Sequence, residues 1–137
     1  MFIDKKFVIL AKEVVKTIRM TNRKIHVVGQ YDCDGIASSG IICHALKRLG
    51  KEYTLSLCSR LSTFIIDEIN QSSPALVIFS DLGSGQKHIL SKLNSPAILI
   101  DHHIPDRVSI KNVIEFNPNP YGLNGSIEVC SSSLAYF

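Results

Sequence analysis

The sequence has no tryptophan, few aromatic side chains and no long apolar run. Its 137 residues include 7% aromatics and four cysteines, Cys33, Cys43, Cys58 and Cys130, none of them in a Cys-x-x-Cys pair. A surface built mainly for base stacking is therefore not expected, nor is a disulfide framework or a structural zinc site, and we expect buried, reduced thiols. No apolar run approaches the ~20 residues of a membrane span, and the N-terminus lacks a signal peptide. These absences predict a cytoplasmic protein without a membrane partner.

The overall composition is that of an ordinary globular domain. Hydrophobic residues make up 45% of the chain and charged residues 20%, and the net charge is +3. A chain of this size and composition can bury a real core. The mild positive charge permits a partner that carries phosphate but does not require one.

Strand-like and helix-like segments alternate along the chain. Apolar residues from about Ile3 to Met20 recur at three- and four-residue steps, which predicts an amphipathic helix. The same reasoning predicts further helices over 36–49, 62–70, 86–93 and from 126 onward, strands over 24–28, 53–58, 76–79, 97–100 and 113–116, and a loop over 29–35. This alternation with short connections predicts an α/β fold, a doubly wound, mainly parallel five-stranded sheet with flanking helices.

Two of the expected strands run directly into potential metal ligands. The fourth strand ends in Asp101, His102 and His103, and the third is followed by Asp81. Open parallel sheets bind ligands at the carboxyl ends of their strands. Two consecutive histidines have no packing reason to stand here, so we predict that at least one binds metal. Since neighbours in extended chain face opposite ways, the other is expected to face either a substrate phosphate or the residues that surround the metal ligands. Asp81 has the alternative of serving only as a turn or cap residue.

The first strand leads into a second acidic motif. Asp32 and Asp34 are separated by one cysteine, and in extended backbone both carboxylates would reach one metal centre. Gly35 then permits a sharp turn into a helix, whose first amides, near Ser38, present partial positive charge to a phosphate. The alternative is a turn whose Asp side chains only cap the helix.

The mixture of carboxylate and imidazole groups indicates which metal is expected. Such donors suit Mn²⁺ or Mg²⁺ better than thiol-seeking metals. Two ions about 3.5–4 Å apart would hold an attacking water and a departing oxygen in line. The sequence therefore predicts a metal-dependent site for phosphoryl transfer.

At these residues the chain resembles the DHH-family phosphoesterases, close to the RecJ-like nucleases of archaeal type. Asp32-Cys33-Asp34-Gly35 matches the first family motif, Asp81 the second and Asp101-His102-His103 the third. Downstream, Asn117-Pro118 and the segment 131–136 resemble the corresponding parts of archaeal members. The similarity covers nearly the whole chain.

The resemblance implies a manganese-dependent phosphodiesterase or exonuclease that acts on single-stranded DNA or RNA, with replication or repair proteins as further candidate partners. Two Mn²⁺ ions are expected, with Mg²⁺ as the alternative. The implied metal ligands are Asp32, Asp34, Asp81, Asp101 and His102. The candidate catalytic residues are Asp34, Asp81 and His103, and the candidate phosphate contacts are His103, Gly35 and Ser38.

The chain also departs from the family pattern. Gln30 stands where relatives carry His or Asp, so we expect one weakened metal site, with the Gln30 amide orienting water or a ligand. We expect residues 1–137 to be the N-terminal part of a DHH domain, without the fourth motif and the C-terminal substrate-binding domain. Two alternatives stay open: a weakened or inactive module for replication or repair assembly, and a phosphodiesterase for small phosphate esters or oligonucleotides.

Overall fold

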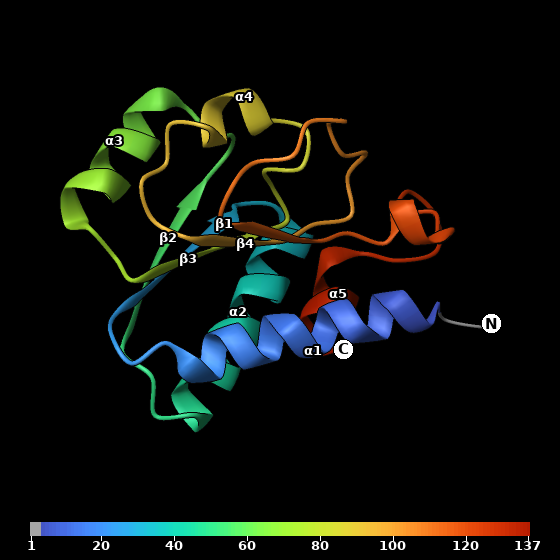
Figure 1. The fold of residues 1–137 in the computed structure, drawn as a ribbon, viewed down its shortest axis with the longest axis horizontal. Coiled ribbons are helices and arrows are strands. Elements are labelled where there is room, and N and C mark those ends of the chain that lie inside the picture. Colours follow the sequence, from blue (N-terminus) through green and yellow to red (C-terminus); the bar gives the residue numbers. More distant parts are fainter. Residues whose placement is uncertain (1–3) are drawn as a thin grey trace.

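Five parallel strands form one sheet in the computed structural model, which describes residues 4–137 (Figure 1). The strand order is β2-β1-β3-β4-β5, and every neighbouring pair is parallel. The elements in chain order are α1 (Lys5–Met20), β1 (Ile25–Gln30), α2 (Cys33–Arg48), β2 (Tyr53–Cys58), α3 (Thr63–Ser72), β3 (Leu76–Ser80), α4 (Lys87–Leu90), β4 (Ala97–Ile100), β5 (Val113–Phe116), a 3₁₀ turn (Asn119–Tyr121) and α5 (Ser131–Tyr136). The predicted five-stranded parallel sheet is confirmed.

The central strands are buried on both faces. In β3, Leu76 and Ile78 pack into the layer formed with α1, α2 and α5, whereas Val77 and Phe79 pack into the layer formed with α3 and α4. Successive side chains of a strand point to opposite faces, so a strand covered on both sides needs apolar residues at every position. The continuous apolar run in this part of the sequence has that cause, and the doubly wound architecture is confirmed.

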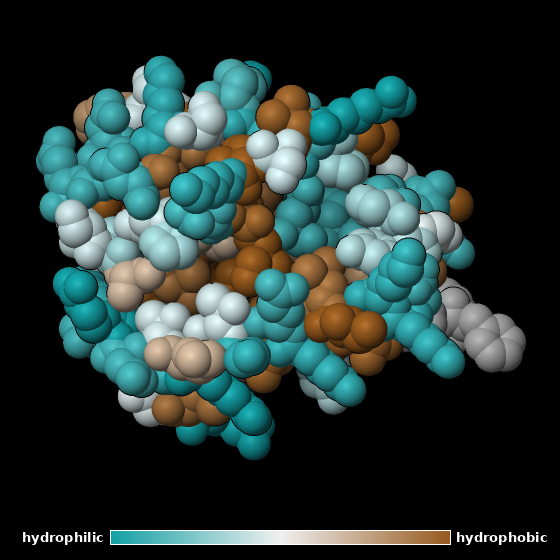
Figure 2. Space-filling model, in the orientation of Figure 1, coloured by the Kyte–Doolittle hydropathy of each residue, from teal (hydrophilic) through white to brown (hydrophobic). Residues whose placement is uncertain are grey.

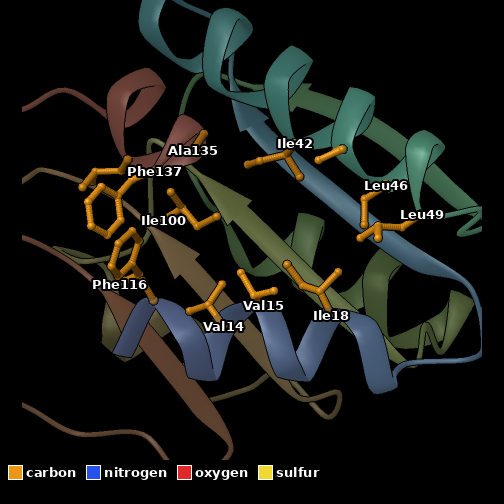
Figure 3. Close-up of a pocket in the computed structure, with 13 residues that line it drawn as sticks. Val14, Val15, Ile18, Ile42, Leu46, Leu49, Ile100, Phe116, Ala135 and Phe137 are labelled. Atoms are coloured by element: carbon orange, nitrogen blue, oxygen red, sulfur yellow. The ribbon is translucent and has the colours of Figure 1, made fainter. Parts of the chain in front are cut away.

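The layer under α1 and α5 contains an apolar cavity (Figure 3). Val14 and Ile18 of α1 line one side, and Ile42 of α2 and Phe116 of β5 line others. Phe7 of α1 stacks on the Phe116 ring with 4.5 Å between centroids. Figure 2 shows apolar side chains reaching the surface between the two helical layers, on an otherwise mainly hydrophilic face. This packing holds α1 and α5 against the sheet.

Several element ends differ from those expected. The second helix begins at Cys33, three residues early, because Asp32 caps it. The last helix begins at Ser131 and not near 126, because the residues just before it are held in turns by Asn124, whose carbonyl accepts from Glu128 N–H at 2.8 Å. The helix expected over 86–93 is shorter, at Lys87–Leu90. The expected start of the first helix at Ile3 lies outside the described residues.

All four cysteines are free thiols, as expected. Cys43 is buried and Cys58 half-buried, but Cys33 and Cys130 are exposed, so the prediction of buried thiols is wrong for these two. Both lie at helix starts on the open edge of the sheet, Cys33 as the first residue of α2 and Cys130 as the N-cap of α5. Within residues 4–137 no helix combines the length and apolar character that crossing a membrane requires.

Candidate metal centre

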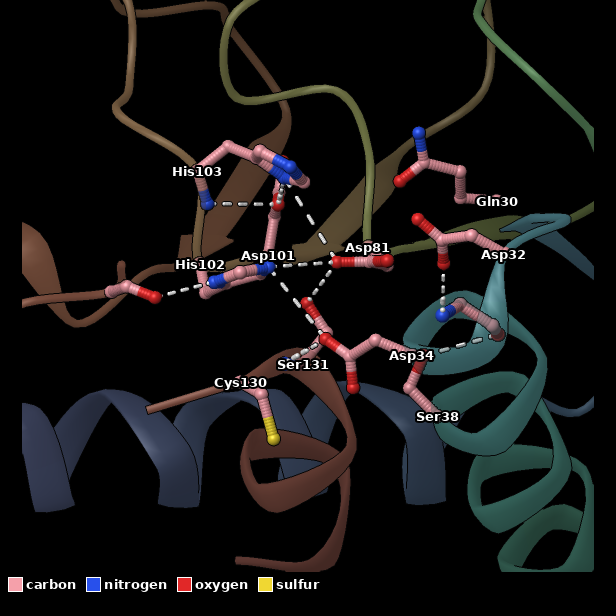
Figure 4. Close-up of polar contacts among 12 residues, drawn as sticks. Gln30, Asp32, Asp34, Ser38, Asp81, Asp101, His102, His103, Cys130 and Ser131 are labelled. Atoms are coloured by element: carbon pink, nitrogen blue, oxygen red, sulfur yellow. Dashed lines mark hydrogen bonds and ion pairs between the residues drawn. The ribbon is translucent and has the colours of Figure 1, made fainter. Parts of the chain in front are cut away.

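The carboxyl ends of β1, β3 and β4 meet at one edge of the sheet. The chain order reverses between β1 and β3, because β2 lies on one side of β1 and β3 to β5 lie on the other. Ligands of open α/β sheets bind at such a switch point. Asp32 and Asp34 follow β1, Asp81 follows β3, and Asp101 and His102 follow β4, and Figure 4 shows these side chains gathered around one centre.

The first motif starts a helix instead of continuing a strand. Asp32 is the N-cap of α2, its Oδ1 accepting from Gly35 N–H at 2.9 Å, and Asp34 lies in the first turn. The prediction that both carboxylates project from extended backbone is therefore wrong, and the capping alternative holds for Asp32. A Cβ on Gly35 would overlap the Gln30 carbonyl oxygen, so glycine is needed to bring α2 this close to β1.

Gly35 and Ser38 have internal hydrogen-bond partners. The Gly35 N–H is used by Asp32. Ser38 is fully buried, and its hydroxyl lies 2.6 Å from the Ser80 hydroxyl and donates to the Gly35 carbonyl at 3.2 Å. Both polar groups therefore have partners inside the protein, and the phosphate contacts expected from these two residues stay predictions.

Asp81 is the most constrained carboxylate of the cluster. It is 1% exposed and has a positive φ of 65°, a region that non-glycine residues seldom occupy. Burial, together with the nearby charges of Asp34 and Asp32, raises the pKa of Asp81 to about 7, although the Ser131 hydroxyl donates to its Oδ1 at 2.8 Å. A divalent cation would relieve this accumulation of negative charge.

The start of α5 holds Asp34 in place. The backbone N–H groups of Ser131 and Ser132 donate to the two Asp34 oxygens at 2.7 and 2.9 Å. Burial raises the pKa of Asp34, but hydrogen bonds from Ser132 and Ser131 outweigh that effect, so the pKa lies below its ordinary value. Sequence reasoning noted these serines only within a stretch of family resemblance and assigned them no role.

His102 is oriented by a backbone carbonyl. Its Nδ1 lies 2.6 Å from the Gly125 oxygen, which can only accept, so Nδ1 carries the proton and Nε2 keeps its lone pair in the neutral ring. That Nε2 lies 3.2 Å from Asp81 Oδ1 and 3.6 Å from Asp34 Oδ2. A Cβ on Gly125 would overlap the His102 carbonyl oxygen, so glycine is required for this approach. His102 thus presents a ligand atom beside two carboxylates.

Asp101 faces protein donors. It is fully buried, with Oδ1 accepting from the backbone and ring N–H groups of His103 at 3.1 and 2.7 Å and Oδ2 accepting from Ser84 N–H at 2.9 Å. Burial raises the pKa of Asp101, but the hydrogen bonds from His103 and Ser84 outweigh it and lower the pKa. The Asp101 side chain in turn raises the pKa of His103. In this geometry Asp101 orients His103, and its expected ligand role stays a prediction.

The two histidines lie side by side. Their ring centroids are 4.5 Å apart, so the prediction that they face opposite ways is wrong. The backbone leaves the extended conformation after β4, where Asn117 and Asn119 side chains donate to the carbonyls of His103 and His102, both at 2.8 Å. The asparagines therefore hold both rings toward Asp81.

A hollow opens beside the cluster. It is lined by Gln30, Ser59, Arg60, Asp81, Leu82, Gly83, Gly85, Gln86, Asp101 and His103. Arg60 is exposed and adds a positive charge to this rim. Sequence reasoning did not identify Arg60, because nothing local connects the end of β2 to the other motifs.

The donor set fits a divalent cation. Among residues 4–137, Asp81, His102 and His103 each offer a ligand atom, and these atoms lie within 4.8 Å of one another. Asp34 adds a carboxylate next to His102. Oxygen and imidazole donors without thiolate are typical of Mn²⁺ and Mg²⁺ sites more than of thiol-seeking metals.

Comparison with solved structures shows the same fold in known proteins. A RecJ structure from Thermus thermophilus in complex with Mn²⁺ matches with a TM-score of 0.75 and 20% identity, covering 96% of this chain and 20% of that chain. A manganese-bound exonuclease RecJ matches with a TM-score of 0.77 and 18% identity, covering 99% and 36%. CDC45 from Entamoeba histolytica matches with a TM-score of 0.64 and 17% identity, covering 77% and 23%.

Sequence comparison identifies the family. An uncharacterized protein of Methanocaldococcus jannaschii is 34% identical over 138 residues, which cover 91% of this chain and 32% of that protein. The chain thus spans about one third of the length of this curated relative. Residues 24–137 match the DHH family, N-terminal domain. With its three acidic and histidine motifs gathered at one sheet edge, this chain belongs to the DHH family.

Proposed function

We propose that this domain is a manganese-dependent phosphodiesterase that hydrolyses single-stranded nucleic acid. The observation that carries the proposal is the meeting of Asp34, Asp81 and His102 beside an open hollow that bears His103 and Arg60. The RecJ structures described as manganese-bound support the choice of metal, and the description of one as an exonuclease supports a nucleic acid as substrate. That residues 1–137 form the N-terminal part of a longer enzyme stays a prediction.

Each side chain has a distinct task in this proposal. Asp34, Asp81 and His102 hold the cation, which when bound activates water and neutralises charge on the phosphate. His103 is about half exposed, and Asp101 both orients its ring and favours its protonated form. A protonated His103 donates a hydrogen bond to a phosphate oxygen, and Arg60 attracts the neighbouring phosphates.

The proposal is tested by hydrolysis of end-labelled single-stranded DNA, single-stranded RNA, duplex DNA and dinucleotides with Mn²⁺, Mg²⁺ or EDTA. We expect cleavage of the single strands with Mn²⁺ and none with EDTA. Asp34→Asn should lower the rate by about 100-fold or more, because it removes a charged ligand. Asp67→Asn makes the same change on the exposed face of α3 and should leave the rate unchanged. Absence of hydrolysis of every substrate with Mn²⁺ and with Mg²⁺ would contradict the proposal.

A second candidate is a binding module without catalysis, acting in replication or repair assembly. The observation that favours it is Gln30, a neutral amide beside Asp32 and Asp81 at a position where the family resemblance implies His or Asp. The structural likeness to CDC45 shows that the same fold occurs in that protein. Metal binding without hydrolysis of any substrate in the assay above would favour this candidate.

A further inference from the structure

We infer that Gln30 limits the site to one divalent cation, held on the side of Asp34, Asp81 and His102. The inference rests on the proposed function, since it concerns the same metal centre, and it replaces the pair of ions expected from the sequence. Its basis is the position of the Gln30 amide among the carboxylates (Figure 4).

The Gln30 side chain lies at the end of β1, between two carboxylates. When Asp32 and Asp81 are ionised, as metal binding requires, an amide oxygen turned toward them, as drawn in Figure 4, would be repelled by the carboxylate oxygens. A half-turn of the amide exchanges the positions of its oxygen and nitrogen without changing its shape. The nitrogen, which is a donor, then points toward the carboxylates. The nitrogen then lies 2.9 Å from the Asp81 carbonyl oxygen, 3.2 Å from Asp81 Oδ2 and 3.3 Å from Asp32 Oδ2. Because the nitrogen carries two hydrogens, Gln30 donates to two of these three oxygens at a time.

These hydrogen bonds occupy the carboxylate oxygens on the β1 side of the centre. Asp32 has Oδ1 bonded to Gly35 N–H and Oδ2 bonded to Gln30, so both of its oxygens have protein partners. Asp81 Oδ2 lies within hydrogen-bond distance of the same nitrogen, at 3.2 Å. The amide N–H groups bring partial positive charge to this side, which disfavours a cation there. A second ion would have to displace the amide from both carboxylates.

The opposite side of Asp81 remains suited to a cation. Asp81 Oδ1 lies 3.2 Å from His102 Nε2, and the same nitrogen lies 3.6 Å from Asp34 Oδ2. His102 Nε2 thus lies near one oxygen of each carboxylate, and carboxylate and imidazole are donors that Mn²⁺ accepts. The start of α5 also donates hydrogen bonds to Asp34 and to Asp81 Oδ1, but each carboxylate oxygen keeps a second lone pair. The two sides of Asp81 differ in the third group that faces the carboxylates. On one side it is His102 Nε2, which offers a lone pair, and on the other it is the Gln30 amide nitrogen, which offers only N–H groups. This difference leads to a stoichiometry of one.

The test is the number of Mn²⁺ ions bound per chain without substrate, by equilibrium dialysis with elemental analysis and by electron paramagnetic resonance. We expect the natural protein to bind one ion and give the spectrum of an isolated Mn²⁺. Gln30→His and Gln30→Asp each supply a ligand in place of the amide, and we expect two ions with an exchange-coupled spectrum. Gln71→His and Gln71→Asp are matched controls on exposed α3, and both should bind one ion.

The outcomes separate this inference from the proposed function. Two ions in the natural protein, together with hydrolysis of single strands, would overturn the role of Gln30 and leave the proposed function standing. One ion in both Gln30 variants, with circular dichroism spectra like that of the natural protein, would also overturn it. If neither variant folds, the ion count of the natural protein still decides. Binding of no ion would overturn both proposals.

Discussion

At the scale of single residues, ionisation of Asp81 couples the metal centre to pH. The carboxylate is buried beside Asp34 and Asp32, and its pKa is raised to about 7. The ordinary pKa of an aspartate is 3.8, so folding without a cation shifts Asp81 toward its neutral form. A cation requires the charged form, so protons and metal compete for this side chain.

We predict that Mn²⁺ affinity rises with pH up to about 7 and then levels off. Below the raised pKa of Asp81, each pH unit should weaken binding by about tenfold, because one proton must leave for the ion to bind. Above it, Asp81 is already ionised. Isothermal titration from about pH 5 to about pH 9 measures the profile. A profile that is flat across neutral pH would contradict the assignment of Asp81 as a ligand.

We predict that Arg60→Ala weakens substrate binding more than chemistry. The exposed Arg60 lines the hollow beside His103 and offers no metal-ligand atom. KM for a single-stranded oligonucleotide should rise about tenfold with little change in kcat, and the effect should shrink at high salt. The control is Arg48→Ala, which removes the same charge at the last turn of α2, the end of this helix that is opposite to Asp34. A loss in kcat alone would place Arg60 in another role.

At the scale of elements, α5 connects the cavity layer to the metal centre. Ala135 near its far end and Phe137 just after it line the apolar cavity together with Phe116 (Figure 3). Its first residue, Ser131, is fully buried and bonds to both Asp34 and Asp81. Packing of one end of this short helix therefore determines where the other end holds the carboxylates.

We predict that Ser131→Ala lowers Mn²⁺ affinity by about 10- to 100-fold. The substitution removes the hydroxyl that orients Asp81 at 2.8 Å, while the backbone N–H still bonds Asp34. Titration calorimetry with Mn²⁺ measures the change, and Ser126→Ala, at an exposed serine ahead of the helix, should bind as the natural protein does. Equal affinity in both variants would show that Asp81 does not depend on α5.

At the scale of the whole molecule, the metal centre joins parts of the chain that are distant in sequence. Asp34 comes from α2, Asp81 from the end of β3 and His102 from the segment after β4, and α5 contacts the first two. A cation bound at this edge would hold these elements together in the folded state and find no such site in the unfolded chain. Metal binding and folding stability are therefore linked.

We predict that Mn²⁺ raises the melting temperature and that EDTA reverses the rise. A ligand present at 100 times its Kd stabilises the folded state by about 2.7 kcal/mol, which corresponds to a rise of roughly 6–10 °C for a domain of this size. Differential scanning calorimetry with and without Mn²⁺ measures it. Asp34→Asn should lose most of the shift and Asp67→Asn should keep it. No shift in the natural protein would contradict a site shared among these elements.

Much of the fold and part of the site could be predicted from local sequence. Alternating strand and helix patterns predicted the five strands, and the apolar run over 76–79 indicated a strand covered on both faces. Acidic and imidazole residues directly after three strands predicted a cluster at one edge, since parallel strands end together. The family followed from the same motifs. Each of these features is carried by a few consecutive residues, which is why the sequence alone determined them.

The tertiary structure decided how the clustered side chains divide their tasks. Asp101 bonds to His103 and Ser84 and orients the histidine, although its position after β4 resembles that of a ligand. Ser131 reaches Asp81 across fifty residues of sequence, and Arg60 and Gln30 meet at the rim of one hollow. These roles depend on which donor lies within about 3 Å of which acceptor. Such distances are set by the packing of helices on the sheet, and no local pattern in the sequence encodes them.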